Sequence, residues 1–245
     1  MSKPGRIFEI DFLRGTAIVM MVLYNWLFAL DYLGVYQTPI TSGFWFYFAR
    51  ITASIFIILA GVSLTISASR HRNDAHPFLR HIKRGLMILS LGVGVSIVTW
   101  LFLDDAYVRF GILHLIGISI ILAYPLINLR YSNLALGLAF IAAGIYLQRV
   151  ATTISGCLWL GAAPENFYTV DYFPVLPWFG VFLLGVFLGN SSYENGARKY
   201  RIWNLSGLPI AKALAVLGRN SLFIYIIHQP ILIAALYSLG VNFVF

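Results

Sequence analysis

Four polar residues stand inside long apolar stretches of this sequence: Asn25, Arg50, His114 and His228. A strongly polar side chain in the bilayer interior is costly unless it meets a polar partner or a wet cavity, so such residues are functional candidates. A neutral histidine is a common general base toward a hydroxyl or an amine, and an asparagine amide can donate a hydrogen bond to developing negative charge. These residue types therefore suit a site that moves a proton and stabilises an oxyanion.

Helix geometry predicts that the four residues lie at similar depths. At a rise of about 1.5 Å per residue, Asn25 lies roughly 16 Å and His228 roughly 13 Å from the side on which their helices begin. Arg50 and His114 lie roughly 8–9 Å below the opposite surface by the same count. A single residue of this kind more often forms a hydrogen bond between helices. Four such residues at comparable depth favour a shared site.

Charged residues near one membrane surface extend this set. Asp31, Asp105 and Asp171 lie at the ends of apolar stretches on the same side as Arg50 and Arg109, where a carboxylate can neutralise a guanidinium. We expect a substrate on that side to meet four of these charged residues, namely Arg50, Asp31, Arg109 and Asp171.

The elements that position these residues are predicted to be membrane-spanning helices. The chain has 245 residues, is 60% hydrophobic and 11% charged, and has a mean hydropathy of +0.82, well outside the usual range of soluble domains. One span takes about 20 apolar residues. Runs of that length predict seven spans, at about 12–30, 44–68, 84–103, 108–127, 133–149, 172–190 and 220–243. We therefore expect an all-α polytopic transmembrane bundle that forms one domain over residues 1–245.

Two further segments leave the number of spans open. Residues 150–165 are apolar but short, and residues 203–218 contain Pro209. Either segment is compatible with a re-entrant or interfacial position. An eighth crossing is the main alternative to seven.

The basic residues predict the orientation of the bundle, because Lys and Arg accumulate in cytoplasmic segments near the membrane. With the N-terminus inside, all but three of the 17 Lys and Arg residues fall on the cytoplasmic side; the exceptions are Arg50, Arg109 and Arg149. Topology thus accounts for the net charge of +8 without nucleic acid. We predict a multi-pass protein of the cell membrane, with a cytoplasmic N-terminus and lipids as partners.

The loop between the second and third predicted spans contains His71, His76 and His81 beside Asp74. Their spacing fits no recognised pattern of metal ligands, so we expect solvated side chains and no metal site. The single cysteine, Cys157, excludes an internal disulfide and a cysteine-based metal site.

Five segments of the chain resemble blocks of a known family, in the order in which that family carries them. They are EIDFLRGTAIVMMVLYN, ASIFIILAGVSLTIS, VRFGILHLIGIS, DYFPVLPWFGVFLLG and LGRNSLFIYIIHQP. The family is the catalytic domain of heparan-α-glucosaminide N-acetyltransferase, within the wider group of transmembrane acyltransferases. The resemblance implies transfer of an acyl group, typically acetyl from acetyl-CoA, to an acceptor such as a sugar or glycan on the non-cytoplasmic side.

The resemblance also implies roles for individual residues. Asn25 matches an asparagine at the family's active centre, Arg14 matches the arginine of the first motif, and His228 matches a histidine of the last block. His228 or His114 would then act as the general base, and Asn25 as the hydrogen-bond donor to the oxyanion.

The donor of the acyl group would arrive from the cytoplasm. Its phosphates would meet Arg80, Lys83 and Arg84 through charge-assisted hydrogen bonds, and Arg14 begins the helix nearby on the same side. Topology and contact with anionic lipid also account for these basic residues.

Two other functions stay open at this point. Intramembrane His and Arg also line transport pathways, although the chain shows no internal repeat typical of transporters. The animal enzyme of the family carries its key histidine in the outer loop after the first span, and the corresponding stretch LFALDYLGVYQ contains none. A non-catalytic subunit that binds an acyl-CoA or a lipid is therefore the second alternative. The sequence leaves open the acceptor, the acyl chain and the oligomeric state, a homo-oligomer included.

Overall fold

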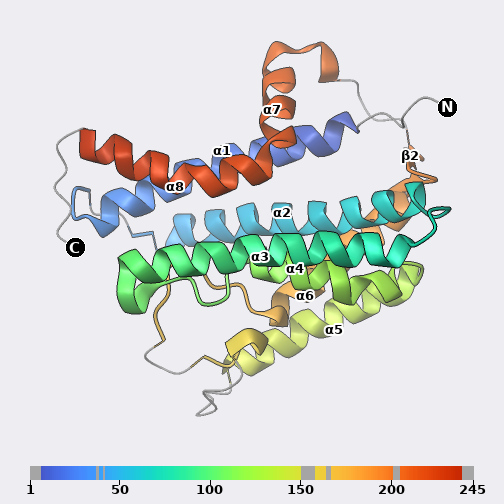
Figure 1. Ribbon diagram of the computed structural model, residues 1–245, viewed down its shortest axis with the longest axis horizontal. Coiled ribbons are helices and arrows are strands. Elements are labelled where there is room, and N and C mark those ends of the chain that lie inside the picture. Colours follow the sequence, from blue (N-terminus) through green and yellow to red (C-terminus); the bar gives the residue numbers. More distant parts are fainter. Residues whose placement is uncertain are drawn as a thin grey trace. The chain divides into compact units, whose positions relative to one another are not determined.

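A computed structural model of the protein describes residues 7–36, 39–40, 42–149, 158–163, 167–200 and 205–238. These residues are almost entirely α-helical, as the sequence predicts (Figure 1). They belong to two compact units, one made of residues 1–56 and 202–245, the other of residues 57–201. Helix α2 passes from the first unit into the second, so each unit is described by itself.

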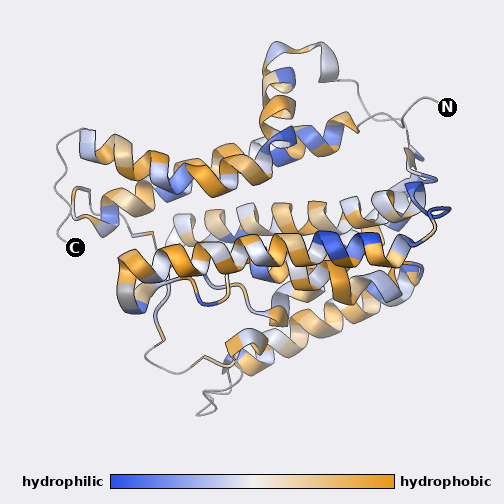
Figure 2. Cartoon of the chain, in the orientation of Figure 1, coloured by the Kyte–Doolittle hydropathy of each residue, from blue (hydrophilic) through white to orange (hydrophobic). Residues whose placement is uncertain are grey.

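Six of the seven predicted spans correspond to helices that are long and apolar enough to cross a membrane, within the part of the chain that the structure describes. These helices are α1 (Phe8–Tyr32), α2 (Gly43–Arg70), α3 (Pro77–Leu103), α5 (Arg130–Arg149), α6 (Val175–Ser192) and α8 (Ser221–Ser238). Figure 2 shows apolar residues along most of their length. The expectation of a polytopic transmembrane bundle is confirmed.

The one remaining predicted span, 108–127, is shorter in the structure. It contains α4 (Ile112–Ala123), whose 12 residues reach only about 18 Å, and the 3-10 turn η2 (Tyr124–Leu126). The segment 203–218, expected to be re-entrant or interfacial, contains η4 (Leu205–Gly207) and the helix α7 (Pro209–Arg219). Most of the segment 150–165 lies outside the described residues, and the rest includes η3 (Leu158–Leu160).

In the first unit, α7 crosses α1 near the N-terminal end of α1. Pro209 at the first turn starts α7, because its missing N–H would have no intrahelical partner there. Gly15 of α1 and Gly218 of α7 face each other's backbones so closely that a Cβ on either would overlap the carbonyl of Leu214 or Asp11. After this crossing, α8 runs alongside α1 in the same direction (Figure 1).

The second unit packs its helices in pairs through glycines. α3 and α4 meet where a Cβ on Gly85 would lie 2.8 Å from the carbonyl oxygen of Gly117. α5 and α6 meet in the same way, since a Cβ on Gly137 would lie 3.0 Å from the carbonyl oxygen of Gly180. Small residues allow such approaches and replace the hydrophobic driving force that is missing between helices in lipid. Large apolar side chains, among them Phe182 and Leu115, fill the core of this unit.

A short hairpin follows α6. Strands β1 (Tyr193–Glu194) and β2 (Ala197–Arg198) pair antiparallel around Asn195 and Gly196, both with positive φ. An Asn-Gly pair is the usual choice for a two-residue hairpin turn, because both residues tolerate this conformation. The Gly196 carbonyl accepts a hydrogen bond of 2.7 Å from the Arg70 guanidinium, which ties the hairpin to the end of α2.

The α1–α7 crossing generates a stability prediction. We expect Gly15→Ala and Gly218→Ala each to lower the free energy of unfolding by about 1–3 kcal/mol, because a rigid backbone carbonyl occupies the space that the new methyl group needs. Thermal unfolding of the purified protein in detergent measures the loss.

The matched control is Gly94→Ala in α3, where no atom lies within 4 Å of an added Cβ. This change should leave stability unchanged or raise it by up to about 1 kcal/mol through helix propensity. Equal unfolding temperatures for Gly15→Ala and Gly94→Ala would contradict the packing described here.

Candidate functional site

Asn25 is joined to the last helix of the first unit by a side-chain hydrogen bond. The Nε2 group of Gln229 in α8 donates to Asn25 Oδ1 at 2.7 Å. Asn25 Nδ2 donates one hydrogen bond of 2.9 Å to the carbonyl oxygen of Met21, one turn earlier in α1. The amide of Asn25 is therefore held at both ends. Its second N–H has no partner among the described residues and is available to an oxyanion.

His228 stands next to Gln229 in α8 and is buried, with 8% of its surface exposed. Its Nδ1–H donates to the carbonyl oxygen of Tyr225 at 2.6 Å. A neutral imidazole with the proton on Nδ1 carries a lone pair on Nε2. That Nε2 is buried and has no hydrogen-bond partner among the described residues. His228 thus has the tautomer that a general base needs.

Pro230 follows these two residues within α8. Because proline has no N–H, it cannot close the helical hydrogen bond to the carbonyl of Ile226. The carbonyl oxygen of Ile226, close to His228 in the helix, is therefore left without its usual helical donor.

The first unit holds three more of the sequence candidates. The Arg50 guanidinium lies 4.6 Å from the centre of the Phe46 ring. Asp31 is half-buried in the last turn of α1. Arg14 is half-buried in the second turn of the same helix.

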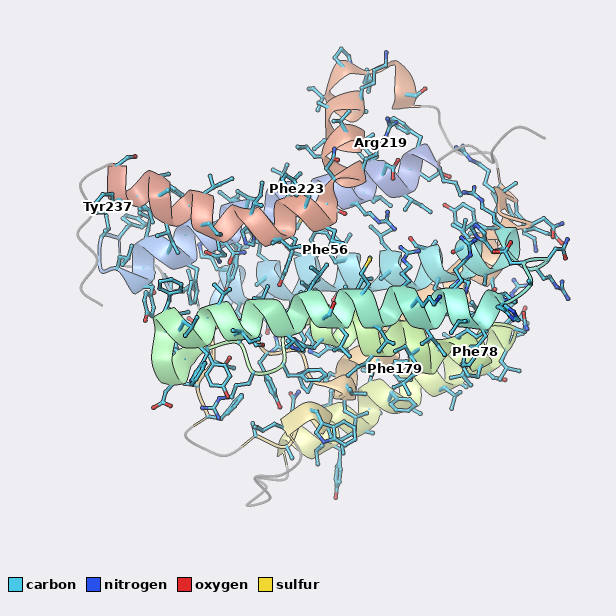
Figure 3. The ribbon with its side chains drawn as sticks, in the orientation of Figure 1. Phe56, Phe78, Phe179, Arg219, Phe223 and Tyr237 are labelled. Atoms are coloured by element: carbon cyan, nitrogen blue, oxygen red, sulfur yellow. The ribbon has the colours of Figure 1, made fainter. Side chains whose placement is uncertain are left out.

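Asp11 has a partner that its sequence neighbourhood does not suggest. Its Oδ2 lies 3.3 Å from Nε of Arg219, the last residue of α7. The Asp11 carboxylate is 9% exposed, whereas the Arg219 side chain is 44% exposed. Figure 3 shows Arg219 where α7 meets α8, beside α1. This ion pair joins α7 to the first turn of α1, on the N-terminal side of Asn25.

His114 belongs to the second unit, at the start of α4. The backbone N–H of Gly111 donates to His114 Nδ1 at 3.2 Å, so the proton of the neutral ring is on Nε2. The side chain is 7% exposed and packs where Gly92 of α3 leaves room for it. In its neutral form His114 therefore has a hydrogen-bond donor at Nε2, whereas His228 has an acceptor at its own Nε2.

Asp171 helps to fix the start of α4. Its Oδ2 accepts a hydrogen bond of 3.2 Å from the backbone N–H of Ile112. A backbone bridge joins Phe110 to Tyr172, and Phe173 N–H donates to the Phe110 carbonyl oxygen at 2.8 Å. The two polar loops that precede α4 and α6 are therefore tied together beside His114.

Arg109 lies in the same loop pair, against aromatic rings. Its guanidinium carbon is 5.0 Å from the centre of the Tyr107 ring and 5.4 Å from that of Phe167. Its Nε is buried without a hydrogen-bond partner among the described residues. A stacked guanidinium with an unused donor is suited to an anionic or polar ligand group.

The beginning of α3 carries the three basic residues predicted to meet a donor: Arg80, Lys83 and Arg84. All three are exposed. Arg80 also pairs with Asp74 at 2.8 Å. Figure 2 shows this end of α3 as strongly hydrophilic, in contrast to the rest of the helix.

The expectation that His71, His76 and His81 are all solvated is wrong for His81. His81 is 1% exposed, because α3 begins at Pro77 and turns this side chain inward against the Tyr124 ring, 4.8 Å away. Its Nδ1–H donates to the Pro77 carbonyl oxygen at 2.7 Å. Among the described residues, no group of three His, Cys, Asp or Glu side chains is placed to hold a metal ion.

The structure thus joins some candidates and assigns others to different units. Asn25, His228, Arg14, Arg50 and Asp31 belong to the first unit, whereas His114, Arg109, Asp171 and the basic start of α3 belong to the second. Sequence reasoning missed Gln229, although it is a polar residue in the apolar run IYIIHQP.

The Asn25–Gln229 hydrogen bond is expected to be measurable as a coupling energy. In a double-mutant cycle of Asn25→Ala and Gln229→Ala, we expect about 0.6 kcal/mol of coupling and at most about 1.7 kcal/mol, the range for such bonds in membrane proteins. Unfolding by sodium dodecyl sulfate in mixed micelles gives the four free energies.

Ser238→Ala combined with Gln229→Ala is the control for this cycle, since among the described residues Ser238 bonds only to Ala235 of its own helix. These two changes should be additive within about 0.3–0.5 kcal/mol. Additivity in the Asn25–Gln229 cycle as well would rule out the bond.

Tyr172 gives a prediction of pH dependence. Burial raises the pKa of Tyr172 from 10.0 to about 12, and its hydroxyl donates to the Leu158 carbonyl oxygen at 2.6 Å. Between these two pH values the unfolded chain loses this proton while the folded chain keeps it, so stability falls as pH rises. We expect the unfolding temperature to fall more steeply above about pH 10 in the wild type than in Tyr172→Phe. Parallel curves for the two proteins from pH 8 to 12 would refute this role.

A family model described as "Heparan-alpha-glucosaminide N-acetyltransferase, catalytic" matches residues 6–230. The match covers most of the chain and runs through both units. Comparison with curated proteins gave no significant match, and comparison with solved structures gave none either.

Proposed function

Because the chain belongs to the heparan-α-glucosaminide N-acetyltransferase catalytic family, we propose that it is a membrane-embedded acyltransferase. It transfers an acetyl or another acyl group from acyl-CoA to a hydroxyl or amine of an acceptor, a sugar or glycan. The observation that carries this proposal is the pair of neighbours His228 and Gln229. One presents an unpartnered, buried Nε2, and the other holds the amide of Asn25.

The chemistry follows from the hydrogen bonds of these side chains. His228 Nε2 accepts the proton of the acceptor hydroxyl or amine as the acceptor oxygen or nitrogen attacks the thioester carbonyl carbon. The carbonyl oxygen becomes an oxyanion, and the second N–H of Asn25 donates to it. The tetrahedral intermediate then collapses, the carbon–sulfur bond breaks, and the sulfur takes the proton from His228, so that CoA leaves as the thiol.

His114 belongs to the second unit, and we propose a separate role for it as a hydrogen-bond donor. Since its Nδ1 accepts from Gly111, its Nε2–H is a hydrogen-bond donor toward a polar group of the substrate. We assign the binding of the acceptor to the charged residues that accompany the two histidines: Arg50, Asp31, Arg109 and Asp171. The stacked Arg109, with its unused Nε donor, is the strongest member of this set.

The basic start of α3 is the proposed entry for the donor. Arg80, Lys83 and Arg84 are exposed and together carry three positive charges, which attract the phosphates of acyl-CoA. Arg14 marks the same predicted cytoplasmic side on α1. With a cytoplasmic N-terminus in the cell membrane, the donor would approach from the cytoplasm and the acceptor from the other side. Both units would then form one catalytic domain.

A non-catalytic subunit that binds acyl-CoA is the second candidate. It rests on the first loop, since residues 27–37 contain no histidine where the animal enzyme of the family has its key one. His228 answers this objection in part, because it supplies a buried imidazole of the correct tautomer from another helix.

Release of CoA from acetyl-CoA by the purified protein, with a panel of sugar acceptors, tests the proposed function. We expect His228→Gln to lower the rate about 10²–10⁴-fold, as for loss of a general base. Asn25→Ala should lower it about 10²–10³-fold, as for loss of an oxyanion donor.

His71→Gln is the matched control, because His71 lies in the loop before α3 and outside the proposed chemistry. Its rate should equal that of the wild type. Full activity of His228→Gln would exclude this residue as the base. Binding of acetyl-CoA without turnover would favour the non-catalytic subunit, and absence of binding would favour a transport function.

A further inference from the structure

Helix α7 differs from the other described helices in how its apolar and basic residues are distributed around the helix axis. It is the most strongly amphipathic of the eight α-helices, it has 11 residues, and it is too short to span a bilayer. Figure 1 shows that it runs across α1, which is a predicted span, rather than along it. A helix that crosses a span near its end lies close to the plane of the membrane surface.

The surface of α7 divides into three faces, since successive residues are about 100° apart around a helix. The first face packs on α1 and consists of Ala211, Ala215 and Gly218, all buried. A second, apolar face is exposed and includes Ile210 at 77% and Val216 at 53%. None of the acidic residues of the chain lies in this helix.

The third face is basic and lies between the other two on one side of the helix. Lys212 and Arg219 are seven positions apart, so they lie on one side of the helix, and both are exposed. Arg219 uses its Nε for Asp11, which leaves the outer nitrogens of its guanidinium for another acceptor. Lys212 is exposed and has no hydrogen-bond or ion-pair partner among the described residues.

From this arrangement we infer that α7 lies in the headgroup layer of the bilayer and binds anionic phospholipid through Lys212 and Arg219. The apolar face of Ile210 and Val216 enters the acyl chains, and the basic face meets the phosphates, as in interfacial amphipathic helices. The charge of the basic face selects lipids that carry net negative charge over zwitterionic lipids of the same chain length. A second copy of the protein on the apolar face would leave Lys212 without a counter-charge, since Asp11 pairs only with Arg219 among the described residues.

This binding acts on the helices that carry Asn25 and Gln229. Gly15 and Gly218 lock α7 to α1, and only Asn220 separates α7 from α8. Headgroups that hold α7 in the surface therefore also hold the beginning of both helices at a fixed depth.

Quenching by brominated lipids tests the inference on the full chain in nanodiscs. A fluorescent label is attached at Val216→Cys in α7, or at Ile233→Cys in α8 as the matched control, each in a Cys157→Ser background. Both native side chains are exposed. Nanodiscs of phosphatidylcholine contain a minor fraction of either brominated phosphatidylglycerol or brominated phosphatidylcholine.

We expect brominated phosphatidylglycerol to be enriched about fivefold over brominated phosphatidylcholine at position 216, the effect of one basic residue at a membrane surface, and not enriched at position 233. Lys212→Gln should lower this preference, because only Arg219 then remains on the basic face, and Lys212→Arg should retain it. Equal quenching by the two lipids at position 216 would overturn the inference. Absence of quenching there, with quenching at 233, would mean that protein or water covers α7 and would overturn it as well. A preference unchanged in Lys212→Gln would refute the role of Lys212.

Discussion

The crossing of α1 and α7 is the contact on which the first unit depends. Apolar side chains gain little by leaving lipid, so helices in a bilayer associate through close packing and a few polar bonds. Gly15 and Gly218 omit the Cβ atoms that would separate the two backbones, and Asp11 receives Arg219 at the same place. Because α8 follows α7 after one residue, the crossing also sets the height at which α8 begins beside α1. The contact between Gln229 and Asn25 is a consequence of that height.

The hydrogen bonds of the two catalytic candidates give them different chemistry. His228 donates from Nδ1 to a backbone carbonyl and keeps a lone pair on Nε2, whereas His114 accepts at Nδ1 from a backbone amide and keeps the proton on Nε2. A base and a donor are thus distinguished by local backbone geometry alone. In the proposed acyl transfer, the first tautomer suits a proton acceptor and the second suits a hydrogen-bond donor.

The sequence already contained much of the fold and part of the site. The ends of α1, α2 and α6 lie within four residues of their predicted limits, because span length and hydropathy are local properties of the chain. Asn25 and His228 could be singled out because a polar residue in an apolar run is conspicuous without any structure. The five segments resemble the family in their residues alone, and the match over residues 6–230 confirms the family that they indicated.

Tertiary structure alone decided which side chains meet. Asp11 and Arg219 are 208 residues apart, and no periodicity in either helix indicates their contact. The burial of His81, the bond from Gln229 to Asn25 and the tautomers of the histidines depend on how each helix is rotated about its axis. Hydropathy fixes the length and polarity of a membrane helix, but an almost uniformly apolar helix carries little information about its rotation. That rotation is set by the glycine contacts between neighbouring helices, and these exist only in the folded protein.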